Sequence, residues 1–196
     1  MEEIAINEKA LIERARGGDT DSFSALVRVY QERAIHAAYA IIGNFEDARD
    51  IAQDSFVKAY TSLESFKEQS KFYTWFYRIL VNTSKDFLRK RKLRQLVPFW
   101  FGGLDEEEGG TDPVANVAAV TETAPQELMN RELGAQIFEA LERLPFRQRS
   151  AFSLRYLEGL SLEEIAGSLG ISVGAVKANL WQAGDKMRKY LKGVHP

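Results

Sequence analysis

Apolar residues recur every three or four positions along most of this 196-residue chain, a spacing typical of amphipathic helices. In the first half the pattern predicts four helices: a short one around Leu11–Ala15, a second from Phe23 to about Ile42, a third after Asn44, and a fourth from Phe72 to about Leu93. No segment shows the strict alternation of a half-buried strand. The hydrophobic pattern therefore predicts an all-α fold.

The junction between the second and third predicted helices carries two boundary signals. Gly43 follows the last apolar position, and glycine adopts the left-handed conformation that ends many helices at little steric cost. Asn44 can then accept hydrogen bonds from the first amides of the third helix. Glu46 and Asp47 fall in the first turn, where carboxylates interact favourably with the helix dipole. The sequence thus predicts a sharp turn at 43–44.

Helical periodicity fails between Arg94 and Ala124, where glycine, proline and acidic residues collect. A stretch of roughly thirty residues is too long for a loop inside a compact domain. We therefore predict two small helical domains, residues 1–93 and 126–196, joined by a flexible acidic linker, residues 94–125. The apolar segment Val97–Phe101 within this linker either packs on its own domain or docks on a partner.

The C-terminal domain ends in a recognisable motif. After predicted helices up to Leu144 and from Phe146 to Leu157, Ser161 and Glu164 have the spacing of a capping box. Gly170 stands where the chain must turn, and Ser172 can cap the next helix. Two short helices joined in this way predict a helix-turn-helix, whose second helix enters the major groove of DNA. The same pattern also occurs in helical hairpins that form only core.

Composition narrows the class of protein. The chain has no cysteine, which excludes disulfides and thiolate metal sites. No apolar run approaches the length of a membrane span, and the N-terminus lacks a secretory signal, so we expect a cytoplasmic protein without membrane insertion. The two histidines are His36, inside an apolar helical stretch, and His195, at the terminus, so the sequence offers no convergent set of catalytic or metal-binding groups. We therefore expect no enzyme, no metal, no cofactor and no small-molecule substrate.

Charge is unevenly distributed although the formal net charge is only −2. A DNA-binding protein that acts alone is usually basic, so any DNA binding here must be local or assisted by a partner. The third predicted helix carries an acidic cluster between Glu46 and Asp54, and the fourth ends in a basic cluster between Lys85 and Arg94. The fourth helix also alternates aromatic residues with cations and amides. Such a helix suits the stacking of unpaired bases, or else an ordinary aromatic core face.

Three segments in this order resemble the extracytoplasmic-function (ECF) sigma factors, the small specificity subunits of bacterial RNA polymerase. Residues 47–60 are similar to the family's helix that grips the clamp of the polymerase large subunit. Phe66 with residues 72–82 resembles the segment that melts and contacts the minus-ten promoter element. Residues 144–180 resemble the domain that contacts the minus-thirty-five element. The resemblance covers nearly the whole chain and implies a protein that binds core polymerase and directs promoter recognition, strand opening and initiation.

The resemblance also implies roles for individual residues. The set expected to bind polymerase is Asp47, Asp50, Ile51, Gln53, Asp54 and Phe56. The set expected at the minus-ten element, with the 64–74 loop holding a flipped base, is Phe66, Lys67, Phe72, Tyr73, Thr74, Trp75, Arg78, Asn82 and Lys85. The set expected at the minus-thirty-five element is Ser172, Ala175, Lys177, Ala178, Asn179, Trp181 and Gln182.

The second helix of the motif departs from the family's pattern. The family usually has several arginines after the lysine, whereas here only Lys177 is cationic before Lys186. We expect a weak or unusual minus-thirty-five preference, or a domain that has drifted toward binding protein. A stand-alone helix-turn-helix regulator of duplex DNA is the alternative function, but it leaves the acidic and aromatic helices without a role. The resemblance also implies an anti-sigma factor as a partner.

Overall fold

The computed structural model describes residues 8–96 and 125–192, and within these two ranges all regular structure is helical. The elements are α2 (Glu8–Arg16), α3 (Thr20–Ile42), α4 (Phe45–Thr61), the short 3-10 helix η1 (Leu63–Ser65), α5 (Phe72–Leu96), α6 (Pro125–Glu142), α7 (Phe146–Tyr156), α8 (Leu162–Leu169) and α9 (Val173–Lys192). The apolar segment Val97–Phe101 lies outside the described residues.

The predicted helix boundaries are confirmed where the sequence carried a capping signal. Gly43 has φ of 83°, and the Asn44 side chain accepts a hydrogen bond of 2.9 Å from the amide of Asp47. Ser161 and Glu164 form both halves of the capping box, and Gly170 ends α8 with φ of 63°. The Ser172 hydroxyl accepts from the amide of Ala175 at 3.2 Å. Residues within a few positions of these helix ends therefore determine where the helices begin and end.

Other boundaries differ from the prediction. Helix α5 continues past Leu93 to Leu96, because the basic run consists of strong helix formers and Arg91 makes an ion pair of 3.6 Å with Asp47 of α4. The fourth helix begins at Phe72, as its apolar pattern predicted, so the 64–74 loop implied by the resemblance is not entirely loop: η1 covers Leu63–Ser65 and α5 begins at Phe72. Phe72 and Thr74 are therefore helical residues.

Helices α3, α4 and α5 enclose an aromatic core. The rings of Phe56 and Phe76 stack with centroids 4.4 Å apart, and Phe72 lies between Phe76 and Tyr30. Tyr77 is also buried there, at 1% exposure. Most aromatic residues in the first half of α5 thus form core, as the plainer interpretation of that helix anticipated.

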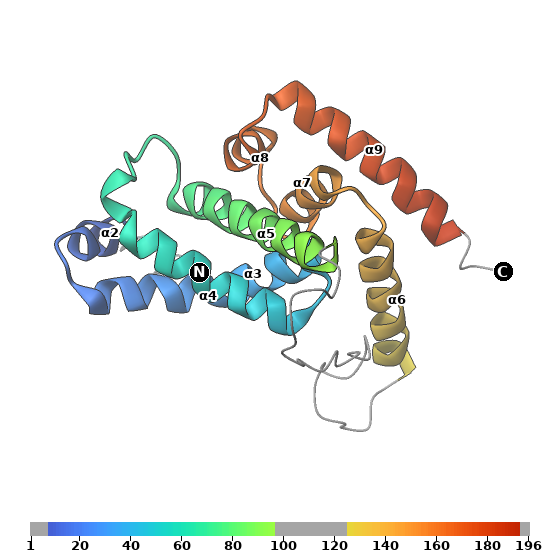
Figure 1. Cartoon of the computed structure of the whole chain (residues 1–196), viewed down its shortest axis with the longest axis horizontal. Coiled ribbons are helices and arrows are strands. Elements are labelled where there is room, and N and C mark those ends of the chain that lie inside the picture. Colours follow the sequence, from blue (N-terminus) through green and yellow to red (C-terminus); the bar gives the residue numbers. More distant parts are fainter. Residues whose placement is uncertain (1–7, 97–124, 193–196) are drawn as a thin grey trace.

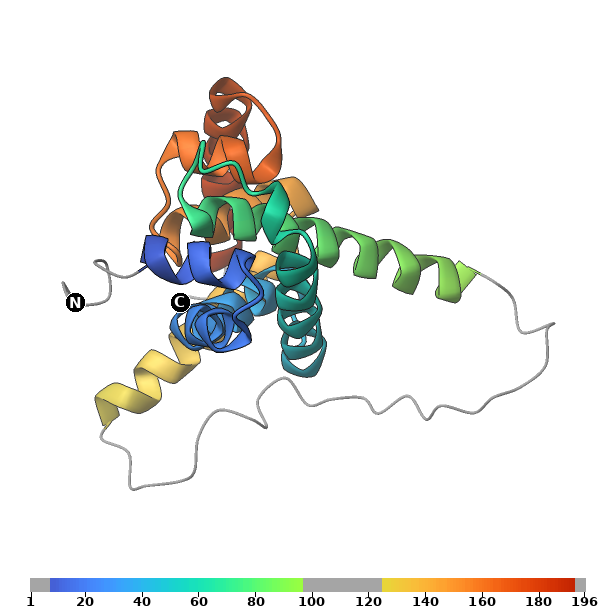
Figure 2. The same cartoon turned by 90° about the vertical axis from the view of Figure 1, so that its left-hand side faces the viewer.

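The two helical halves pack against each other. Helix α8 lies on α5, while α6 and α7 contact α3 (Figure 1). A single cluster of buried residues runs from the first half into the second, where it includes Leu154, Leu160 and Ile165. A smaller cluster joins Ala40 of α3 to α6 and α9. The C-terminal end of α5 projects away from this body, so its basic residues stay exposed (Figure 2).

Candidate docking face and nucleic-acid interface

The outer face of α4 is acidic. Asp50, Gln53 and Asp54 are exposed, whereas Ile51 and Phe56 point into the core. Asp47 is half-buried and pairs with Arg91; burial raises the pKa of Asp47, and the cation of Arg91 offsets this only in part. Among the residues that the structure describes, Asp50, Gln53 and Asp54 are therefore accessible to a partner, whereas the buried Ile51 holds the helix in place.

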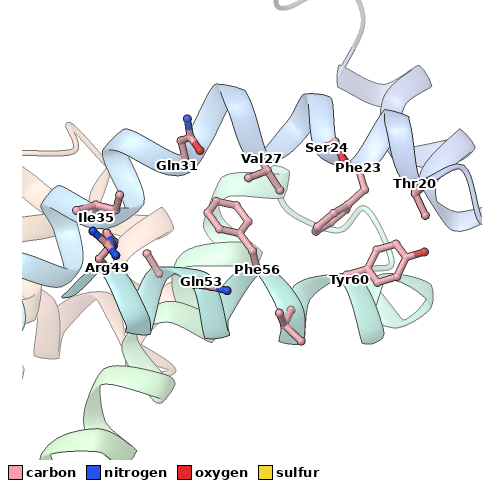
Figure 3. Close-up of a pocket in the computed structure, with 12 residues that line it drawn as sticks. Thr20, Phe23, Ser24, Val27, Gln31, Ile35, Arg49, Gln53, Phe56 and Tyr60 are labelled. Carbon is pink, nitrogen blue, oxygen red and sulfur yellow. The ribbon is translucent and has the colours of Figure 1, made fainter. Parts of the chain in front are cut away.

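A groove of about 620 Å³ runs between α3 and α4 beside this acidic face (Figure 3). Its walls are mainly apolar, with Phe23, Val27, Phe56 and Tyr60 pointing toward the gap and Gln53 at its edge. Phe56 thus belongs both to the core and to the groove. Among the described residues that line the groove there is one cation, Arg49, and no carboxylate, so the acidic face lies next to the groove and not in its walls. An acidic face next to an apolar groove is suited to a protein partner with basic and apolar side chains.

The residues expected at the minus-ten element divide into two groups. Phe66, Phe72 and Thr74 are buried, and Tyr73 and Trp75 are partly buried. The exposed members are Lys67, Arg78, Asn82 and Lys85. On α5, positions 78, 82 and 85 follow i, i+4, i+7 spacing and share one face, which presents two cations and an amide. The structure therefore assembles a polar strip, while the buried aromatic residues support it.

The Arg-poor helix α9 presents a small exposed face. Lys177, Ala178 and Gln182 are exposed, and the Trp181 side chain is the most exposed large apolar group described, at 71%. Asn179 instead donates a hydrogen bond of 2.8 Å to the carbonyl of Ala175 in its own helix. Gln182 accepts one of 2.6 Å from Gln148 of α7. Lys177, Ala178 and Trp181 are thus the residues of this set best placed for a base edge.

The structure also brings together polar residues that the sequence analysis missed. The Glu158 carboxylate accepts hydrogen bonds from Tyr77 of α5 and, at 3.1 Å, from Arg33 of α3. Burial and the nearby Glu158 charge raise the pKa of Tyr77. Glu164 of α8 similarly meets Tyr73 and Lys71. Residues so far apart in the chain carry no local signal that they meet.

Within the described ranges, no helix is both long and apolar enough to cross a bilayer. Comparison with known families gives two matches. The Sigma-70 region 2 model matches residues 26–94, and the model of Sigma-70 region 4 matches residues 135–184. The first runs from within α3 to near the end of α5, and the second runs from within α6 through α7 and α8 into α9.

Several characterised relatives match along almost their whole length. The ECF RNA polymerase sigma factor SigW of Bacillus subtilis is 33% identical, over 95% of this chain and 97% of the relative. The ECF RNA polymerase sigma-E factor of Haemophilus influenzae is 34% identical over 95% and 96%. The sigma-E factor of Escherichia coli K12 is 35% identical over 91% of each chain.

Two solved structures share the fold. CnrH, solved in complex with the cytosolic domain of CnrY, matches with a TM-score of 0.67 at 22% identity, over 95% of this chain and 97% of CnrH. The sigma factor RpoE of Bartonella quintana, solved with the anti-sigma factor NepR, matches with a TM-score of 0.64 at 23% identity, over 87% and 96%.

Two helical modules that match these two models define a transcription initiation factor of the sigma-70 type. The chain belongs to the ECF sigma factors of RNA polymerase. It is thus a specificity subunit that joins core RNA polymerase and directs promoter recognition and initiation, in a family of initiation factors rather than of catalytic enzymes.

Proposed function

We propose that three separate surfaces divide the work of this sigma factor. The acidic face of α4, with the adjoining groove, docks on the clamp of core polymerase. The polar strip on α5, formed by Arg78, Asn82 and Lys85, lies against the melted minus-ten strand. The exposed face of α9 contacts the minus-thirty-five element.

The observation that carries this proposal is the opposite chemistry of two neighbouring helices. Exposed carboxylates at Asp50 and Asp54 on α4 repel phosphates but attract a basic protein surface. Exposed cations on α5, from Arg78 to the basic cluster, attract phosphates. The same helical domain can therefore bind polymerase through α4 and DNA through α5.

Helix α9 is too weakly charged to hold promoter DNA unaided. Only Lys177 offers a cation on its exposed face before Lys186, and the whole chain has a net charge of −2. Phosphate contacts supply most of the affinity of a self-sufficient DNA-binding protein. The base preference of α9 therefore acts only when polymerase holds the template, which argues against a stand-alone regulator.

The anti-sigma partner and the compartment belong to the same proposal. CnrH was solved with the cytosolic domain of CnrY, and the Bartonella RpoE with the anti-sigma factor NepR. Support for a comparable partner here comes from the apolar groove between α3 and α4, which is open to a protein segment. We place the chain in the cytoplasm with its polymerase, and assign it no catalytic activity of its own.

The test combines polymerase binding with run-off transcription on a promoter library. Wild-type chain mixed with core polymerase should form a stable complex and start RNA synthesis at selected sites. The double variant Asp50→Arg/Asp54→Arg should lose at least about ten-fold in polymerase affinity, or about 1.4 kcal/mol. Both side chains are exposed, so its thermal stability should barely change.

The matched control is Glu13→Arg, which reverses an exposed carboxylate on α2 away from the acidic face of α4. It should bind polymerase like the wild type. Equal affinity of the wild type and the double variant would refute the role of α4. A wild-type chain that yields no selective start sites would refute the proposed function as a whole.

A further inference from the structure

Helix α2 packs against η1, at the start of the chain segment that leads into α5 (Figure 1). We call residues 66–71 of this segment the entry loop. Arg16, in the last turn of α2, reaches across to it. The guanidinium donates to the backbone carbonyls of Leu63, at 3.5 Å, and Phe66, and at 2.7 Å to the carboxylate of Glu68. One side chain of α2 therefore holds the chain on both sides of Lys67.

The ring of Phe66 links this contact to the first turn of α5. The guanidinium carbon of Arg16 lies 5.6 Å from the centre of the Phe66 ring, within the range of a cation–π interaction. The same ring packs against Trp75 and Phe72, with centroids 5.2 and 5.9 Å away, and Phe66 is buried. Arg16 thus connects α2, through Phe66, to the aromatic residues at the start of α5.

The backbone of the entry loop is strained at Glu68. Its φ is 56°, and within residues 8–96 and 125–192 no other residue except glycine has a positive φ. A side chain with a β-carbon disfavours this left-handed conformation, so it persists only where neighbouring contacts enforce it. Arg16 supplies such a contact, and the Lys9 ammonium lies 4.0 Å from the second carboxylate oxygen of Glu68. Contacts from α2 therefore impose the conformation of the loop.

The entry loop held in this way presents polar side chains to solvent. Lys67, Gln69 and Ser70 are exposed and lie immediately before α5. A base that leaves the stack is identified by hydrogen bonds to its edge, and polar groups in fixed positions discriminate between bases because a wrong base leaves them unpaired. A loop that had to become ordered on binding would lose part of that discrimination. Fixing the loop in advance therefore favours selective contact with one base.

We propose that Arg16 is a positioning residue for minus-ten recognition: it holds the entry loop so that Lys67, Gln69 and Ser70 face one unstacked base. Arg16 acts through the loop and does not itself touch DNA. This inference rests on the proposed function, because the assignment of α5 to the minus-ten strand comes from there. The Sigma-70 region 2 match begins at residue 26, so the inference extends the minus-ten surface to a helix outside that match.

Run-off transcription with core polymerase tests this role on promoters that carry each of the four bases at every minus-ten position. Arg16→Ala should reduce the preference between the best and the worst base about ten-fold at one position and leave polymerase affinity unchanged. The preference is a ratio between promoters for one protein sample, so a smaller folded fraction cannot alter it. Arg14→Ala is the matched control, because Arg14 lies on the same helix but pairs with Asp19 at 4.0 Å. An unchanged preference at every position in Arg16→Ala would overturn the proposal.

Trypsin cleavage after Lys67 tests whether Arg16 holds the entry loop, without polymerase or DNA. Lys67 is exposed, and a protease cuts such a loop at a rate set by how often the loop leaves its folded conformation. Cleavage at this bond, followed by mass spectrometry, should be about ten-fold faster in Arg16→Ala than in the wild type or Arg14→Ala. Equal rates in the three proteins would overturn the inference. Because no promoter is involved, this result separates a failure of the Arg16 role from a failure of the proposed function.

Discussion

Glu164 offers a quantitative test of how the two halves are coupled. Its carboxylate closes the capping box of α8 and also meets Tyr73 and Lys71 at the start of α5. Burial alone would raise the pKa of Glu164, but hydrogen bonds from Tyr73, the Ser161 amide and Lys71 outweigh it and lower the pKa to about 2. The ionised form is therefore favoured by folding.

The size and sign of the effect follow from linkage. The difference between the ordinary pKa of 4.5 and a value of about 2 corresponds to about 3 kcal/mol. Because the Lys71 side chain is 68% exposed, solvent screening reduces this, and we expect about 1–2 kcal/mol. A lowered pKa stabilises the fold above pH 4.5. That contribution is lost as the pH falls from 4.5 toward 2.

The perturbation is Glu164→Gln, which keeps a side-chain oxygen for the capping box but removes the charge. Urea unfolding followed by circular dichroism should show the variant about 1–2 kcal/mol less stable at pH 7, with the gap shrinking between pH 4.5 and 2. Glu163→Gln is the matched control, since Glu163 is exposed in the same helical turn. A gap for Glu164→Gln that is as large at pH 2 as at pH 7 would refute the argument.

Three further substitutions give distinct expectations. Gly170→Ala should lower the free energy of unfolding by about 1 kcal/mol, because φ is 63° and space for the methyl is not limiting; a neutral result in denaturant titration would contradict this. Phe76→Ala should lower the free energy of unfolding by about 3–5 kcal/mol, since the ring is 1% exposed and stacks on Phe56. A thermal melting temperature equal to that of the wild type would count against the aromatic core. Trp181→Ala should leave stability unchanged but weaken minus-thirty-five-dependent transcription several-fold, measured against a promoter without that element; equal loss on both promoters would argue against a base contact.

The site assignments show how far local patterns reach. Acidic residues at helical spacing on α4 predicted an exposed face, and Asp50 and Asp54 are exposed. The same spacing could not decide whether Ile51 contacts a partner or packs in the core, because both roles require an apolar side chain. Only packing against α3 and α5 decided that it is buried.

The sequence by itself predicted the all-helical class, the helix-turn-helix and several helix ends. It could do so because helix caps, left-handed glycines and apolar periodicity depend on residues only a few positions apart. The sequence also carried three segments similar to one family, in the family's order. The tertiary structure alone decided that α8 rests on α5 and that Glu158 meets Arg33 and Tyr77. Such contacts depend on the burial of a whole interface between distant parts of the chain. No local sequence pattern predicts which two buried polar groups will form a hydrogen bond across it.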